Sequence, residues 1–252
     1  TSFLNIFMNK KIKTGILIVL VIIALFGIYY INDYYHAQKT AIDCLENNSD
    51  VLVVKTSNGL LFDGKGNESA LIFYPGAKVE YTSYAPLLKN ISSRGIDCYA
   101  VEMPFNLAFL GQNSADDIIK NSSYEHYFIS GHSLGGAMAA SYINGTNNTD
   151  GLILFAAYPS SEIEKPVLSI YGSCDKVLNM DKYNKSKSLI KGNFTECIID
   201  GANHAQFGYY GNQSGDGKAL ISAKLQQNQT VNKIISFIIL MTLNMWAIFL
   251  II

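Results

Sequence analysis

The sequence lacks the residue patterns that most cofactors, metals and nucleic acids require. Its formal net charge is −1 over 252 residues, so it offers no broad basic surface to a phosphate backbone. No cysteine and histidine residues stand at the spacing of metal ligands, no G-x-G-x-x-G follows an expected strand, and no phosphate-binding P-loop is present. We therefore expect no nucleic-acid partner, no metal and no organic cofactor.

Cysteine is scarce as well, with four residues in the chain. An exported protein can oxidise them, but four cysteines allow three pairings and the sequence does not choose among them. They are Cys44, Cys98, Cys174 and Cys197.

The stretch from Ser130 to Gly136 is the most informative part of the chain. It reads Ser-Gly-His-Ser-Leu-Gly-Gly and fits G-x-S-x-G, in which a serine stands on a sharp turn between a strand and a helix. The run 124–130 before it resembles a strand, and the small residues 135–141 resemble the start of a helix. We predict that Ser133 is a nucleophile in strained backbone at the positive end of a helix. The alternative is a glycine-rich turn with a passive serine.

A serine nucleophile needs a base, and the base needs a carboxylate to orient it. In this arrangement the order along the chain is serine, acid, histidine, and His204 is the only histidine after Ser133. The predicted acid is Asp175, which follows an expected strand at 166–171. The alternatives are a surface-loop role for His204 and a capping or turn role for Asp175. Two other candidates for the acid are Asp181 and Asp200.

The oxyanion that forms during acyl transfer needs two backbone N–H donors. The first is expected at Leu134, directly after the nucleophile. The second is expected after the apolar run 70–74, where Ala77 supplies the N–H and Gly76 permits the close approach of substrate. The alternative is an ordinary Pro-Gly turn.

Four motifs in this order resemble the alpha/beta hydrolases, and more narrowly the group called alpha/beta hydrolase family 5, which is similar to dienelactone-hydrolase-like esterases. The motifs are residues 73–79, 131–136, 171–177 and 201–208. The resemblance covers roughly residues 50–238 and implies an α/β-hydrolase fold with Ser133, Asp175 and His204 as catalytic residues. It implies much less about the substrate. Relatives usually have glycine at the position of Ala77, but alanine still supplies an N–H.

Strand-like and helix-like segments alternate along the rest of the chain, after a leading hairpin at 51–55 and 60–63. Continuous apolar strands predict a mostly parallel sheet with helices on both faces and a site at the carboxyl ends of the strands. The gap between residues 158 and 166 is too short for a lid domain, so we expect an open site. The expected strands are 70–74, 96–102, 126–130, 151–157, 166–171 and 195–199, and the expected helices lie near 82–93, after Ser133, and at 114–121, 180–190 and from about 216.

The substrate pocket is harder to predict. Gly76, Phe105 and Phe207 are expected to contribute to it, because they lie in loops beside the predicted catalytic residues. The two aromatic residues fit the core of the protein equally well.

An apolar run at 15–31 follows three lysines near the N-terminus. It is just long enough to span a bilayer and lacks a clear cleavage site, so we predict a signal anchor; a cleaved signal is the alternative. The lysines favour the cytoplasmic side, which places residues 1–14 in the cytoplasm and the catalytic domain in an extracytoplasmic or lumenal compartment.

The remaining boundaries follow from composition. We expect a polar connector at 32–50, the hydrolase domain at 51–238 and an apolar tail at 239–252. Whether this tail also enters the membrane is left open.

These observations together predict a membrane-anchored serine hydrolase that cleaves a carboxylic ester or thioester through an acyl-enzyme. Its substrate is expected to be a small-molecule or lipid-like ester with a short to medium acyl group, because no lid is present. The alternatives are an acyltransferase that uses the same triad and a non-catalytic membrane receptor that retains the fold. The oligomeric state is left open.

Overall fold

The structure is a computed structural model that describes residues 10–249, with the backbone alone for residues 244–249. The chain divides into two units, Thr1–Tyr34 and Tyr35–Ile252. The first contains one described helix, and the second contains the sheet and the other helices.

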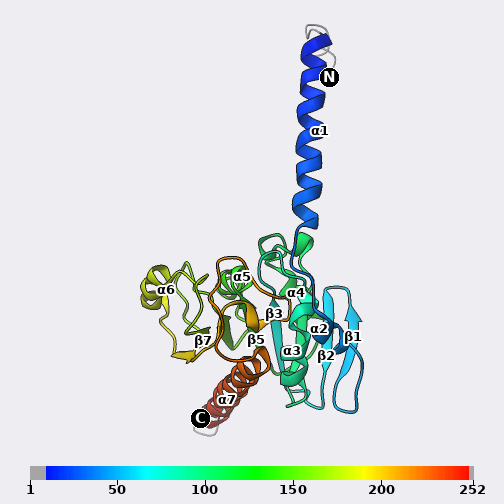
Figure 1. Cartoon of the computed structure of the whole chain (residues 1–252). Coiled ribbons are helices and arrows are strands. Elements are labelled where there is room, and N and C mark those ends of the chain that lie inside the picture. The colour runs from blue at the N-terminus through cyan, green and yellow to red at the C-terminus, as the bar shows by residue number, and fades with distance from the viewer. Residues whose placement is uncertain (1–9, 250–252) are drawn as a thin grey trace. The chain divides into compact units, whose positions relative to one another are not determined.

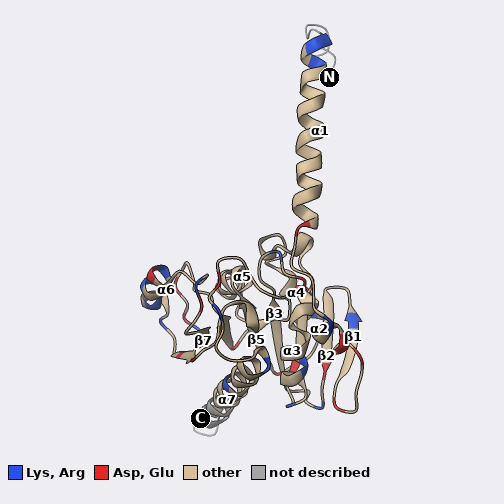
Figure 2. Cartoon of the chain, viewed as in Figure 1, with Lys and Arg blue, Asp and Glu red and all other residues tan. Residues whose placement is uncertain are grey.

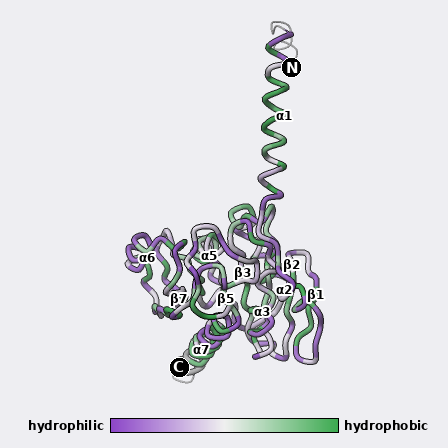
Figure 3. Tube along the Cα trace, viewed as in Figure 1, coloured by the Kyte–Doolittle hydropathy of each residue, from purple (hydrophilic) through white to green (hydrophobic). Residues whose placement is uncertain are grey.

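Helix α1 (Lys10–Asn32) has 23 residues, none of them buried. At 1.5 Å per residue it is about 34 Å long, slightly more than the hydrocarbon thickness of a bilayer. Figure 3 shows that it is hydrophobic over most of its length, and Figure 2 shows its lysines gathered at one end. Among the described helices it alone is long and apolar enough to cross a membrane, a property that signal sequences share. Residues 1–9 of the expected cytoplasmic segment lie outside the described residues.

An eight-stranded sheet forms the centre of the second unit, in the order β1-β2-β4-β3-β5-β6-β7-β8 (Figure 1). The predicted hairpin pairs β1 with β2, and β2 pairs antiparallel with β4, whereas all other neighbours are parallel. The strands are β1 (Leu52–Thr56), β2 (Gly59–Asp63), β3 (Ser69–Tyr74), β4 (Asp97–Val101), β5 (His126–His132), β6 (Gly151–Phe155), β7 (Val167–Gly172) and β8 (Phe194–Ile199). The expected mostly parallel sheet is therefore confirmed.

Helices cover both faces of this sheet. Side chains of α3 and α7 pack into one apolar cluster, and side chains of α4 and α5 pack into a second. Every residue of β3, β4, β5, β6 and β7 is buried, as continuous apolar strands covered on two sides require. The helices are α2 (Lys39–Asp43), α3 (Ala85–Ser92), α4 (Ser114–Asn121), α5 (Leu134–Ile143), α6 (Met180–Ser186) and α7 (Ala223–Phe249).

The expected connector is more ordered than its polar composition suggests. The compact unit begins at Tyr35 rather than at residue 51. The N–H of Tyr35 donates to the carbonyl of Lys78 over 2.7 Å, and the N–H of Gln38 donates to the carbonyl of Tyr209 over 2.8 Å. These backbone bonds attach the segment to two loops, which hydropathy does not reveal.

The last helix begins at Ala223 and not near residue 216. Asp216 lies in a loop instead, because its carboxylate accepts the backbone N–H groups of Ala205 and Gly217. Gly215 before it has a φ of +81°, outside the helical range.

Helix α7 packs against the sheet through one face of its middle turns, where Val231, Ile234 and Ile238 are buried. Leu240 and Leu243 are exposed. The expected apolar tail from residue 239 thus continues α7 up to Phe249, and its last three residues lie outside the described part.

Candidate active site

Ser133 stands between the last residue of β5 and the first residue of α5. Its φ of 53° and ψ of −120° are far from the regions that residues with a side chain favour. Such strain persists only where the surroundings enforce it, and here the N–H of Ser133 donates to the carbonyl of Phe155 over 2.9 Å. This backbone hydrogen bond to the end of β6 fixes the turn that carries the side chain of Ser133.

The flanking glycines permit this turn because other backbone lies against them. A Cβ on Gly131 would come within 2.4 Å of the carbonyl carbon of Gly135, and a Cβ on Gly135 would come within 2.2 Å of the carbonyl oxygen of Tyr74. The predicted strand, serine and helix are thus joined as the motif requires.

His204 and Asp175 form a buried pair. Nδ1 of His204 donates to Oδ2 of Asp175 over 2.8 Å, and each side chain is 1% exposed. Oδ1 of Asp175 accepts the N–H groups of Val177 and Leu178, each over 2.8 Å. Asp175 therefore stabilises its own turn with one oxygen and bonds the imidazole of His204 with the other.

The two alternative candidates for the acid, Asp181 and Asp200, occupy other positions in the fold. Asp200 accepts a hydrogen bond from the hydroxyl of Ser173, and Asp181 lies in the first turn of α6. Neither is bonded to His204, whose Nδ1 is occupied by Asp175.

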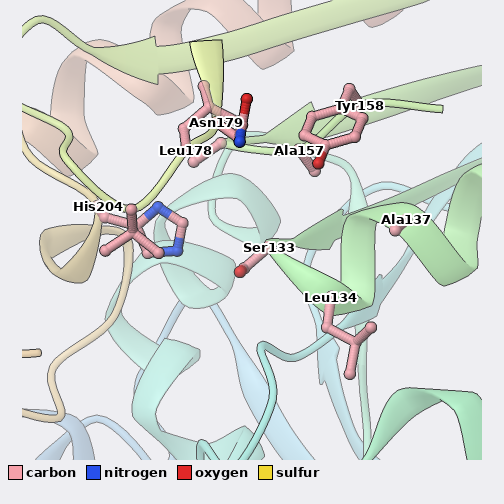
Figure 4. Close-up of a pocket in the computed structure, with 10 residues that line it drawn as sticks. Ser133, Leu134, Ala137, Ala157, Tyr158, Leu178, Asn179 and His204 are labelled. Carbon is pink, nitrogen blue, oxygen red and sulfur yellow. The ribbon is translucent and has the colours of Figure 1, made fainter. Parts of the chain in front are cut away.

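Ser133 and His204 line one cavity. Figure 4 shows the hydroxyl of Ser133 directed toward the ring of His204. Nε2 of His204 is buried and has no hydrogen-bond partner within the described residues, so the two groups face each other without a bond. Nucleophile and base often approach fully only when substrate is bound.

The backbone N–H groups of Leu134 and Ala77 are the predicted oxyanion donors. Leu134 is the first residue of α5, where an N–H has no acceptor within its own helix. Ala77 lies between Gly76, which donates its N–H to Oη of Tyr84 over 3.1 Å, and Lys78, which donates to the carbonyl of Asn106. The loop that carries Ala77 is therefore held on both sides of it.

The cavity beside Ser133 has a volume of about 290 Å³, at the lower end of the range for small-molecule sites. It is shaped by the N-terminal turn of α5 and by the segments after β6 and β7 (Figure 4). Its lining contains no lysine, arginine, aspartate or glutamate. The lining residues are Ser133, Leu134, Ala137, Ala156, Ala157, Tyr158, Val177, Leu178, Asn179 and His204.

None of the three expected pocket residues lines this cavity. Phe207 is fully buried and stacks on Phe155, with ring centroids 5.5 Å apart. Phe105 is 56% exposed, on a turn where its φ is 54°. Gly76 faces the interior, because a Cβ there would lie 3.1 Å from Oη of Tyr84.

Sequence reasoning missed the residues that do line the pocket after β6 and β7, among them Tyr158 and Asn179. A signal was available, because these residues follow two predicted strands directly and parallel strands end at the same edge. Within the described residues, no group of three histidine, cysteine, aspartate or glutamate side chains is placed to hold a metal ion.

A sequence model described as the alpha/beta hydrolase family matches residues 70–228, more than half of the chain. The chain belongs to this family. The match includes Ser133, Asp175 and His204, as well as the loop with Ala77. A comparison with curated proteins found no match.

Solved structures share the fold of this alpha/beta hydrolase at low sequence identity. A predicted CIB-like hydrolase from Thermoplasma acidophilum is 16% identical with a TM-score of 0.53, over 73% of this chain and 98% of its own. The ferulic acid esterase of Streptomyces cinnamoneus is 15% identical with a TM-score of 0.55, over 68% and 66%. Esterase 2 of Thermogutta terrifontis, phosphoramylated by tabun, is 13% identical with a TM-score of 0.55, over 77% and 96%.

A second imidazole, that of His132, packs against His204. Its ring centroid lies 4.4 Å from that of His204. Burial lowers the pKa of His132 well below its usual range, and the neighbouring His204 lowers it further. We therefore expect His132 to be neutral in the folded protein.

Proposed function

We propose that this alpha/beta hydrolase is a serine esterase that cleaves a carboxylic ester or thioester through an acyl-enzyme. The observation that carries the proposal is the buried His204–Asp175 pair, which faces a strained serine across a shared cavity. A histidine with a purely structural role would not require a serine in strained backbone opposite its unbonded Nε2.

In the first half of the reaction, Oγ of Ser133 attacks the carbonyl carbon while Nε2 of His204 takes the hydroxyl proton. Asp175 holds the imidazole in the tautomer that can accept this proton and stabilises the resulting positive charge. The N–H groups of Ala77 and Leu134 stabilise the oxyanion, each by about 3 kcal/mol in comparable sites.

The tetrahedral intermediate then breaks its bond to the leaving oxygen or sulfur, which receives the proton from His204. In the second half, His204 takes a proton from water as the water attacks the acyl carbon. The acid is released, and the proton returns to Oγ of Ser133. An alcohol in place of water would give acyl transfer, so the balance of the two reactions depends on the acceptor.

We further propose that the substrate carries a short, uncharged acyl or alcohol group. The cavity of about 290 Å³ is small, and a charged group there would find no opposite charge in the lining. The segment between β6 and β7 is too short to add a lid that would enclose a long chain.

Labelling with a fluorophosphonate probe tests the enzyme directly. Such reagents phosphonylate an activated serine with loss of fluoride, and the organophosphate tabun modifies the esterase of T. terrifontis. We expect labelling of the native chain and none of Ser133→Ala. A folded native chain that resists the probe and hydrolyses no p-nitrophenyl ester would favour a non-catalytic receptor.

We propose that α1 is a signal anchor, with Lys10, Lys11 and Lys13 on the cytoplasmic side. The hydrolase unit is then extracytoplasmic or lumenal. Full-length protein should remain in membranes after carbonate extraction, and in sealed vesicles its hydrolase unit should resist protease added from the cytoplasmic side. A soluble product shortened by the apolar segment would instead establish a cleaved signal.

A further inference from the structure

Tyr84 and His132 form a buried pair that the proposed mechanism does not use. Oη of Tyr84 lies 2.8 Å from Nδ1 of His132, and both side chains are almost completely buried. One end of this pair touches the predicted base, because the rings of His132 and His204 pack at 4.4 Å. The other end touches the loop of the predicted oxyanion donor, because Oη of Tyr84 accepts the N–H of Gly76 over 3.1 Å.

The direction of the hydrogen bonds follows from the number of donors. Oη of Tyr84 accepts the proton of Gly76 and has one proton of its own, for which Nδ1 of His132 is the acceptor within reach. Burial raises the pKa of Tyr84, so it retains that proton. Nδ1 of His132 is then unprotonated, and the ring carries its hydrogen on Nε2.

The packing around this pair leaves little room for adjustment. A Cβ on Gly76 would lie 3.1 Å from both Nδ1 of His132 and Oη of Tyr84. The ring of Tyr84 packs against Phe73, with centroids 4.6 Å apart. The pair is thus confined between the sheet, the loop that bears Ala77 and the ring of His204.

We propose that Tyr84 and His132 are positioning residues that hold the N–H of Ala77 and the imidazole of His204 in fixed relation to Ser133. This inference rests on the proposed function. The physical reason is that the oxyanion donor and the base come from distant loops, yet must meet one tetrahedral intermediate. A misplacement of about 1 Å can cost roughly 10²-fold in rate.

Tyr84→Phe tests the proposal, since it removes one oxygen and keeps the packed ring. Its kcat for p-nitrophenyl acetate should fall about 10- to 100-fold with little change in KM, because the loss arises in the transition state. Affinity for a trifluoromethyl ketone, which forms an oxyanion adduct with the serine, should fall by a similar factor.

Tyr127→Phe is the matched control. Tyr127 is also buried, and its hydroxyl bonds to Ser122 and Tyr124 at the opposite edge of the sheet. It should lower thermal stability about as much as Tyr84→Phe while leaving kcat and ketone affinity within twofold of native. An equal loss of activity in both variants would overturn the proposal.

A second pair of variants covers the case in which Tyr84→Phe does not fold. His132→Gln keeps a carbonyl oxygen that can accept the hydrogen of Tyr84, whereas His132→Leu removes the acceptor. We expect kcat of the glutamine variant to exceed that of the leucine variant at least fivefold. Equal kcat in two folded variants would contradict the inference, and absence of Ser133-dependent hydrolysis by the native chain would overturn the proposed function along with it.

Discussion

A histidine–aspartate pair with a buried imidazole lies at the carboxyl ends of the strands, here called the carboxyl edge, and another lies at their amino ends, the amino edge. At the carboxyl edge, His204 and Asp175 are 2.8 Å apart. At the amino edge, His126 begins β5, and its Nδ1 lies 3.3 Å from Oδ2 of Asp150. Both histidines are buried, and each has a buried Nε2 without a hydrogen-bond partner within the described residues.

The surroundings of the two pairs differ. The cavity at the carboxyl edge is lined by His204 together with Ser133, whereas the cavity at the amino edge is lined by Asp150 but not by His126. Ser133 is the only serine with positive φ among the described residues. A histidine–aspartate pair is thus not a site by itself; the strained serine and the access to a cavity distinguish one edge from the other.

Removal of the nucleophile should give the largest effect. Ser133→Ala should lower kcat for p-nitrophenyl acetate on the order of 10⁵- to 10⁶-fold, because no other group there forms the acyl-enzyme. Ser122→Ala, at the amino-edge cavity, should leave the rate within threefold. Initial rates on variants of equal thermal stability decide the matter, and a Ser133→Ala protein with native rates would end the esterase interpretation.

Substitution of the two histidines should affect kcat almost as differently as substitution of the two serines. His204→Gln should lower kcat on the order of 10⁵-fold, because the serine loses its base. His126→Gln should keep activity within threefold but cost about 1–3 kcal/mol of unfolding free energy, because it disturbs a buried bond to Asp150. Steady-state kinetics give kcat of both variants, and urea unfolding gives their free energies of unfolding. A lower kcat in His126→Gln than in His204→Gln would contradict the prediction.

The two aspartates give the next largest contrast. In Asp175→Asn an amide oxygen can still accept from Val177 and Leu178, so the turn should persist. The amide NH₂ then faces Nδ1 of His204 and favours the wrong tautomer, which should cost about 10⁴-fold in kcat. Asp150→Asn should have no comparable effect on kcat. Similar rates for the two variants would show that neither carboxylate orients a base.

Filling the two cavities should give the smallest effects. Ala137→Leu reduces the space beside Ser133 and should lower kcat/KM for the butyrate ester about 10-fold relative to the acetate ester. Asn148→Leu, at the amino-edge cavity, should not alter this ratio. A chain-length series on both variants tests whether the acyl group occupies the cavity beside Ser133, and an unchanged ratio in Ala137→Leu would exclude this.

Several parts of the fold could be predicted because their signals are local. The apolar strands, the helix at residues 114–121 and the glycines around Ser133 depend on neighbours within a few positions. The order serine, aspartate, histidine led to Asp175 and His204, which the structure joins by a hydrogen bond.

The errors concern residues whose environment comes from distant segments. Phe207 and Phe105 are both aromatic and both lie in loops, yet one is buried against β6 and the other is 56% exposed. The connector was expected to be separate because it is polar, but its backbone bonds to Lys78 and Tyr209. Amino-acid composition predicts neither the packing of Phe207 nor the backbone bonds of the connector.

By itself the sequence determined the alternation of strands and helices, the apolar N-terminal helix and the turn that bears Ser133, because backbone preferences and hydrophobic periodicity act over short distances. Only the tertiary structure decided which loops meet at the carboxyl edge. It packed His132 against His204, bonded Tyr84 to His132 and formed the pocket after β6 and β7, because these contacts join residues far apart in the chain through packing and buried hydrogen bonds.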